Sequence, residues 1–121
     1  MPITAEQRER VERWLAALRS EEYPQTHSGY MRDAVGYCGL GVAADVADVG
    51  AWAKACHDGR EFYDFKPHPD LPEDQRSLRG LYGLTSRQCD DLCYMNDFEK
   101  LTLRQIADRI DATFGLTTEE D

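Results

Sequence analysis

Apolar residues near the start of the chain recur at helical spacing. They fall at i, i+3, i+4 and i+7: Val11, Trp14, Leu15 and Leu18. Such a stripe predicts an amphipathic helix that buries one side. Thr4 and Gln7 have the spacing of a capping box, in which a hydroxyl and an amide each satisfy a free backbone N–H group. We therefore expect a helix over residues 5–19, followed by a loop over residues 21–29.

The segment 40–49 is apolar on nearly every side. Asp45 and Asp48 are its only polar residues, and their spacing places them on the same side of a helix. A helix that is apolar all round belongs inside a domain, and small residues in it let neighbouring elements approach closely. Gly50 stands where a left-handed residue commonly ends a helix. The pattern predicts a central buried helix that ends at Gly50.

Proline and glycine mark the turns of the C-terminal third. Pro72 suits the first turn of a helix, because its missing N–H has no helical partner there. We therefore expect a short helix over residues 72–78, ended by Gly80 and Gly83. Asn96-Asp97 favours turn conformations and local backbone hydrogen bonds, which indicates a turn after the next helix.

Two further capping-box spacings occur in this third, Thr85 with Gln88 and Thr102 with Gln105. After the second, apolar residues keep helical spacing until Gly115: Leu103, Ile106, Ala107, Ile110 and Phe114. The pattern predicts two capped helices here.

Two short hairpins are expected between the helices. One would pair residues 30–32 with residues 35–37. The other would pair Cys56-His57 with residues 60–63 around Asp58-Gly59, a dipeptide that suits the positive φ angles of a type I′ turn.

Together these elements predict a helix-dominated α+β fold, with about five helices around a central apolar helix and one or two short β-hairpins. The length of 121 residues suits one domain, which we expect to span residues 1–115. The polar residues 116–121 are expected to form a frayed acidic tail.

Acidic residues outnumber basic ones. The chain has 23 Asp and Glu against 14 Lys and Arg, a formal net charge of −9. Nucleic-acid affinity depends on bases that neutralise phosphates, so we expect no sequence-specific nucleic-acid binding. Residues 102–108 resemble the first half of a helix-turn-helix, but no recognition helix follows. An acidic DNA mimic stays open, although the acids occur in short clusters.

No apolar run approaches the roughly 18 residues that a membrane helix needs, and no signal-peptide pattern opens the chain. We therefore expect an intracellular protein without a membrane partner. Its four cysteines would be free thiols: Cys38, Cys56, Cys89 and Cys93. Cys89 and Cys93 lie at i and i+4 on the helix face of Leu92, so we expect them to pack in the core. Zinc is the alternative, because Cys56-His57 and Cys89-x3-Cys93 offer suitable ligands, but no pair has the two-residue spacing of a zinc ribbon. We expect neither a metal nor a cofactor.

The motifs of common enzymes do not occur in the sequence. It contains no Gly-x-Ser-x-Gly, no Walker loop and no Gly-x-Gly-x-x-Gly. Residues 37–41 are rich in glycine but lack the Lys and Ser/Thr of a phosphate loop. Cys38 would act as a nucleophile only beside a base that lowers its pKa. We therefore expect a protein that is not an enzyme and has no catalytic residues.

One stretch, residues 52–68, mixes aromatic and basic side chains. Stacking and charge could together hold a small anionic, nucleotide-like ligand there. The candidate ligand-binding residues are Trp52, Arg60, Tyr63, Lys66 and His68. The alternative is a hairpin whose aromatic residues cover the core while its Lys and Arg stay in water.

Several short islands of sequence are familiar in their order and spacing. They are Tyr37-Cys38-Gly39-Leu40-Gly41-Val42, Leu71-Pro72, Gly80-Leu81, Met95-Asn96-Asp97 and Ile106-Ala107-Asp108-Arg109-Ile110. In these islands the chain resembles a family of small, uncharacterised proteins encoded by tailed phages and prophages. It departs from the family pattern at Gly39, where the family often has a second cysteine.

The resemblance implies a setting, the cytoplasm of a bacterial host, rather than a mechanism. In that setting we expect a non-enzymatic phage accessory protein that binds and modulates a host protein, with counter-defence as one form of such modulation. The nucleotide-like ligand and the DNA mimic are the alternatives. The sequence leaves the oligomeric state open.

Overall fold

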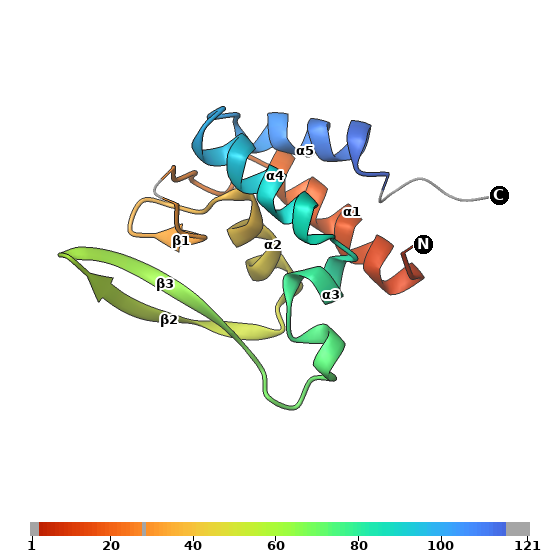
Figure 1. Ribbon diagram of the computed structural model, residues 1–121, viewed down its shortest axis with the longest axis horizontal. Coiled ribbons are helices and arrows are strands. Elements are labelled where there is room, and N and C mark those ends of the chain that lie inside the picture. Colours follow the sequence, from red (N-terminus) through yellow and green to blue (C-terminus); the bar gives the residue numbers. More distant parts are fainter. Residues whose placement is uncertain (1–2, 28, 116–121) are drawn as a thin grey trace.

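Five α-helices and a small antiparallel sheet form the part of the chain that the structure describes, residues 3–27 and 29–115. In this computed structural model the helices gather in one body, and a long hairpin extends from it to one side (Figure 1). The arrangement confirms the helix-dominated α+β fold. In chain order the elements are α1 (Ala5–Arg19), β1 (Arg32–Asp33), α2 (Gly39–Ala47), β2 (Gly50–His57), β3 (Arg60–Pro67), the 3-10 turn η1 (Glu73–Gln75), α3 (Leu78–Tyr82), α4 (Ser86–Asp97) and α5 (Leu103–Thr113).

The first helix, α1, forms as its apolar stripe predicts. The Thr4 hydroxyl accepts a hydrogen bond from the Gln7 N–H at 3.1 Å, and the Thr4 N–H donates to Gln7 Oε1 at 2.8 Å. All four residues of the stripe are buried. The indole N–H of Trp14 donates to the Gly39 carbonyl at 3.0 Å, which joins α1 to the start of α2.

The helix α2 lies among α1, α3 and α4, and its residues from Gly39 to Ala44 are buried. A Cβ atom on Gly41 would collide with the Met31 carbonyl, so glycine permits a close approach of the backbone at this point. The Tyr82 hydroxyl donates to the Ala43 carbonyl at 2.6 Å. The predicted central helix with closely packed neighbours is confirmed.

The predicted end of α2 is wrong. The helix ends before Asp48, which takes the left-handed conformation with φ 53° and ψ 41°. Aspartate is one of the few residues besides glycine that tolerates this region. Gly50 instead begins β2, where a Cβ atom would collide with the backbone carbonyl of Lys66.

The predicted helix over residues 72–78 is also wrong. Only η1 forms there, and Ser77 then caps α3 by accepting a hydrogen bond from the Gly80 N–H at 3.1 Å. Gly80 lies inside α3 and does not end a helix. Glycine is required at this position because a Cβ atom would collide with the Asp74 carbonyl of η1. Gly83 does end the helix, with a left-handed φ of 71°.

The strands β2 and β3 form one long hairpin. Asp58 and Gly59 have φ angles of 51° and 77°, the positive values of a type I′ turn, so the predicted turn is confirmed. The strands are longer than predicted, with eight residues each, and they pair without interruption from Gly50 opposite Pro67 to the turn.

The first predicted hairpin is reduced to a single bridge between Arg32 and Tyr37. The carboxylate of Asp33 accepts hydrogen bonds from the N–H groups of Val35 and Gly36, at 2.8 Å and 3.0 Å. These side-chain bonds make a tight turn in place of a ladder. The strand β1 pairs with β3 instead, and the sheet order is β1-β3-β2.

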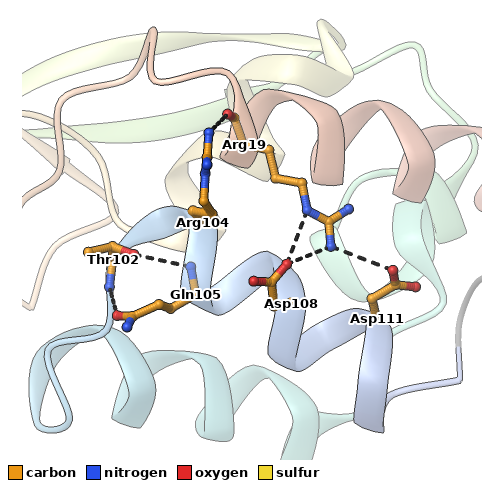
Figure 2. A network of polar contacts seen from close by, with 6 residues as sticks. All are labelled: Arg19, Thr102, Arg104, Gln105, Asp108 and Asp111. Carbon is orange, nitrogen blue, oxygen red and sulfur yellow. Dashed lines mark hydrogen bonds and ion pairs between the residues drawn. The ribbon is translucent and has the colours of Figure 1, made fainter.

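The two predicted capping boxes open α4 and α5. At the start of α5, the Thr102 hydroxyl accepts from the Gln105 N–H at 3.1 Å, and the Thr102 N–H donates to Gln105 Oε1 at 2.9 Å (Figure 2). Arg19, at the end of α1, reaches the carboxylates of Asp108 at 2.9 Å and Asp111 at 3.5 Å (Figure 2). These contacts join α5 to α1 at the surface, above the apolar core that the two helices share.

One hydrophobic core joins the helices. Its largest fully buried side chains include Trp14, Tyr82, Leu18, Leu81, Leu92, Ile106 and Ile110. The tail predicted at residues 116–121 lies outside the described residues. Among those described, no helix has both the length and the apolar character to cross a membrane.

Candidate functional site

The structure distributes the five predicted ligand residues over both faces of the β2–β3 hairpin. Side chains alternate between the faces of a strand. Trp52 faces the same way as Tyr63, since Trp52 lies opposite Phe65 in the register. Arg60 and Lys66 belong to the other face, and His68 follows the end of β3. The hairpin therefore does not assemble these residues into one site.

Arg32, from β1, lies against the aromatic rings of the hairpin. Its guanidinium carbon is 4.4 Å from the ring centre of Tyr63, 4.9 Å from that of Tyr37 and 5.5 Å from that of Trp52. A cation over aromatic rings is attracted by their negative faces. Arg32 thus occupies ring faces on which a nucleotide base would have to stack.

Asp45, on α2, holds the same group of rings from the helical side. The Tyr23 hydroxyl donates to one carboxylate oxygen at 2.6 Å, and the indole N–H of Trp52 donates to the other at 3.1 Å. Burial raises the pKa of Tyr23, and the hydrogen bond to Asp45 raises it further, so the hydroxyl remains a donor. These contacts fix the hairpin to the helices. We name the group the hairpin anchor: Arg32, Tyr37, Asp45, Trp52 and Tyr63.

Cys38 is buried at the N-terminal cap of α2. Its sulfur accepts a hydrogen bond from the Gly41 N–H at 3.4 Å. Burial raises the pKa of the Cys38 thiol from 9.0 to about 11, although backbone hydrogen bonds to the sulfur act in the opposite direction. A nucleophilic cysteine needs a lowered pKa. The geometry gives this thiol a structural role.

The other three cysteines differ in exposure. Cys56 and Cys93 are exposed and Cys89 is partly buried, so the prediction that Cys89 and Cys93 pack in the core is wrong for Cys93. Cys93 lies outside the buried face of α4, which includes Leu92. Within residues 3–27 and 29–115, no group of three or more His, Cys, Asp or Glu side chains is placed to hold a metal ion.

Two large aromatic side chains are exposed on α4 and just after it. Tyr94 is 57% exposed and Phe98 is 76% exposed. Their rings stack on each other, with centres 5.5 Å apart and planes inclined by 22°. They stand at i and i+4, the spacing of neighbours on one helix face. A contiguous exposed aromatic patch indicates an interaction site, whereas single exposed apolar residues are common on protein surfaces.

A shallow groove adjoins this pair between α4 and α5. It has a volume of about 230 Å³ and is lined by Asp91, Tyr94, Met95, Glu99, Arg109, Thr113 and Phe114. Arg109 pairs with Glu99 at 3.7 Å. Arg109 and Thr113 also line a second groove of about 410 Å³ along the outer side of α5. We name this region the α4–α5 surface: Tyr94, Phe98, Glu99, Arg109 and Phe114.

Asn96 is fully buried in the last turn of α4, which corrects the prediction that it forms a turn. Its side-chain amide donates to the Thr26 carbonyl at 2.8 Å and accepts from the Gln25 side chain at 2.8 Å. The Asn96 carbonyl also lies 2.7 Å from Nδ1 of His27. One side chain thus ties the loop before β1 to α4.

Reasoning from the sequence missed the residues that matter most on these surfaces. Arg32 and Asp45 carried no motif, because their roles depend on contacts between distant elements. Tyr94 and Phe98 did carry a signal. They lie at i and i+4 at the end of a helix whose buried side includes Leu92, so they could have been assigned to an outward-facing aromatic patch.

Fold and site define a small, helix-dominated α+β domain whose long hairpin is anchored by an arginine among aromatic rings. The chain belongs to the family described as a domain of unknown function (DUF8296), whose sequence profile matches residues 7–73. The match covers just over half of the chain, so the hairpin anchor lies inside it and the α4–α5 surface lies outside it. No curated protein and no solved structure matches the chain.

Proposed function

We propose that this protein is a non-enzymatic accessory protein that binds a partner protein through the α4–α5 surface and modulates that partner by covering its surface. The exposed stack of Tyr94 on Phe98 carries the proposal. Aromatic side chains of this kind supply large contact area at low entropic cost, and they dominate the energetics of many interfaces.

The charges around the stack indicate what the partner surface offers. Two acids and one base line the groove beside Tyr94: Asp91, Glu99 and Arg109, which pairs with Glu99. The whole chain has a formal net charge of −9. Acidic groups at the rim of an apolar patch attract a partner with a basic rim and reject acidic ones. The partner therefore presents an apolar hollow for the two rings, bordered by Lys or Arg.

The proposed setting is a bacterium that carries a phage or prophage, and the partner is a host protein. The resemblance of residues 37–42 and 95–97 to small phage proteins supports this setting. Covering a host defence protein would be a counter-defence activity. The raised pKa of the buried Cys38 thiol disfavours this thiol as a nucleophile.

The test is capture from bacterial lysate by the immobilised full chain. A variant with both Tyr94→Ser and Phe98→Ser should lose the captured protein, with an affinity for the purified partner lower by at least about tenfold. Binding should also weaken as salt rises, because the charged rims are screened. Titration calorimetry with the purified partner measures both effects.

The matched control is Val35→Ser, because Val35 is 68% exposed on a different part of the molecule. Its variant should capture the partner as the wild type does. Capture that survives the loss of both aromatic rings, or that is lost equally with Val35→Ser, would rule out the α4–α5 surface. Captured DNA-binding proteins that bind equally well without the rings would favour the DNA-mimic alternative.

A further inference from the structure

The strand β2 forms an open edge of the sheet. The order β1-β3-β2 leaves one side of β2 without a neighbouring strand, and the hairpin extends away from the helices (Figure 1). Next to a two-residue turn, alternate residues of β2 bond to β3, so the backbone groups of Trp52, Lys54 and Cys56 point outward. Within the described residues these outward groups form no hydrogen bond.

This edge lacks two of the features that usually prevent strand addition, proline and a bulge. Edge strands are commonly protected by these or by charged side chains, above all lysine. The ladder of β2 is continuous, without a bulge, the strand contains no proline, and its charged residue Lys54 is paired with Glu61 at 3.2 Å. The outer edge of β3, in contrast, is partly covered by β1 and ends at Pro67.

The charge of the hairpin distinguishes a second copy from other occupants. Residues 50–67 contain three bases and three acids: Lys54, Arg60, Lys66, Asp58, Glu61 and Asp64. The hairpin is therefore neutral in a chain of net charge −9. Two copies that meet through their hairpins avoid the repulsion that contact between their acidic helical bodies would cause.

The sequence of β2 is self-complementary in one antiparallel register. When Ala53 of each copy lies on the two-fold axis, Trp52 of one copy lies opposite Lys54 of the other, and Ala51 lies opposite Ala55. An ammonium group beside an indole is favourable. Ala53 then occupies a non-hydrogen-bonded pair, where Cα atoms approach to about 4.5 Å. A register with Lys54 opposite Lys54 would instead oppose like charges.

We infer that two copies of this chain associate through antiparallel pairing of their β2 strands, with Ala53 at the two-fold axis. The product is a six-stranded sheet that runs across the dimer. A hairpin with only a two-residue third strand has little stability of its own, and pairing extends it on its open side. This dimer leaves the α4–α5 surface free.

Sedimentation velocity of the full chain over a wide concentration range tests this dimer. Lys54→Pro removes an outward N–H at the centre of the edge and leaves the bonds to β3 in place. Lys54→Ala is the matched control, because it removes the same side chain and its pair with Glu61 but keeps the N–H. The wild type and Lys54→Ala should dimerise, and Lys54→Pro should weaken the dimer at least about tenfold.

Disulfide trapping tests the register. In a background with Cys56→Ser and Cys93→Ser, the Ala53→Cys variant should form a disulfide-linked dimer on mild oxidation, whereas Ala51→Cys alone should not. A mixture of Ala51→Cys and Ala55→Cys should also cross-link. A wild type that stays monomeric at every concentration, leaving β2 to another protein's strand, would overturn the inference. Equal cross-linking of Ala51→Cys and Ala53→Cys would overturn it as well.

Discussion

At the level of single residues, Asn96 shows how a polar side chain can be essential without a motif. Asparagine is common in turns and seldom fully buried, so the residue type at position 96 favoured a turn. Its burial becomes favourable because Gln25 supplies an amide donor, and Thr26 and Asp97 supply a carbonyl and a carboxylate acceptor, each at 2.8 Å. A buried polar group left unpaired costs about 1–3 kcal/mol.

Asn96→Ala should therefore lower the free energy of unfolding by about 2–3 kcal/mol, since the Thr26 carbonyl loses its donor in a buried place. Urea denaturation followed by circular dichroism measures this change. Asp90→Ala, at an exposed position of the same helix, should stay within about 0.5 kcal/mol of the wild type. Equal stability of the two variants would mean that the Asn96 hydrogen bonds contribute nothing.

Arg32 illustrates a second limit of predicting the role of a single residue from the sequence. The sequence placed aromatic and basic residues in one stretch, 52–68, and suggested a ligand site there. Strand alternation sends Lys66 away from Trp52, and the cation that meets the rings comes from β1 instead. The two-residue turn at Asp58-Gly59 fixes the hairpin register, and with it the separation of Lys66 from Trp52. The contact of Arg32 with the rings, in contrast, depends on the tertiary fold.

At the level of elements, three helix starts could be predicted because each depends on a local motif. Thr4, Thr85 and Thr102 all form the capping boxes that their spacing indicated. A capping threonine satisfies a backbone N–H within its own helix, so no distant contact is needed to place it.

Thr102→Ala should destabilise the protein by about 1 kcal/mol, because the Gln105 N–H loses its acceptor at the start of α5. Thr102→Ser keeps the hydroxyl and should leave the midpoint of urea unfolding nearly unchanged. If the serine variant were as unstable as the alanine variant, the loss would come from packing of the threonine methyl group rather than from the cap.

The elements that were predicted wrongly depend on contacts between distant segments. Gly80 stays helical because η1 approaches its backbone, and Gly50 joins a strand because β3 approaches it. A glycine has the same local preference in both cases, so its neighbours in space decide between ending a helix and packing closely. The strand lengths of the hairpin are set in the same way, by pairing over its whole length.

At the level of the whole molecule, buried ionisable groups couple folding to high pH. Burial raises the pKa of Cys38 to about 11 and raises the pKa values of Tyr23, Tyr37 and Tyr82 above their ordinary 10.0. In the unfolded chain these groups release their protons at their ordinary values. Above about pH 9 the unfolded state therefore binds fewer protons than the folded state, and stability falls as pH rises.

The free energy of unfolding should thus be insensitive to these groups at pH 7–8 and should fall between about pH 9 and pH 11, with Cys38 contributing about 2 kcal/mol of the loss. Urea titrations at a series of pH values measure the slope. In a Cys38→Ser variant the decline between pH 9 and pH 11 should be smaller by about 2 kcal/mol, because only Cys89, Cys93 and the tyrosines still respond there. A variant that declines in parallel with the wild type from pH 9 would contradict this assignment.

Two kinds of contact join elements in this molecule: ion pairs near the surface and the cation–aromatic contacts of the hairpin anchor. The pairs of Arg19 with Asp108 and Asp111 lie near the surface, where dissolved ions compete with them. Arg32 is instead held at contact distance by uncharged rings, which mobile ions neutralise far less. In concentrated salt the surface ion pairs between α1 and α5 weaken, and the shared apolar core still joins these helices. The contacts that orient the hairpin keep their strength, so the two attachments respond differently to ionic strength.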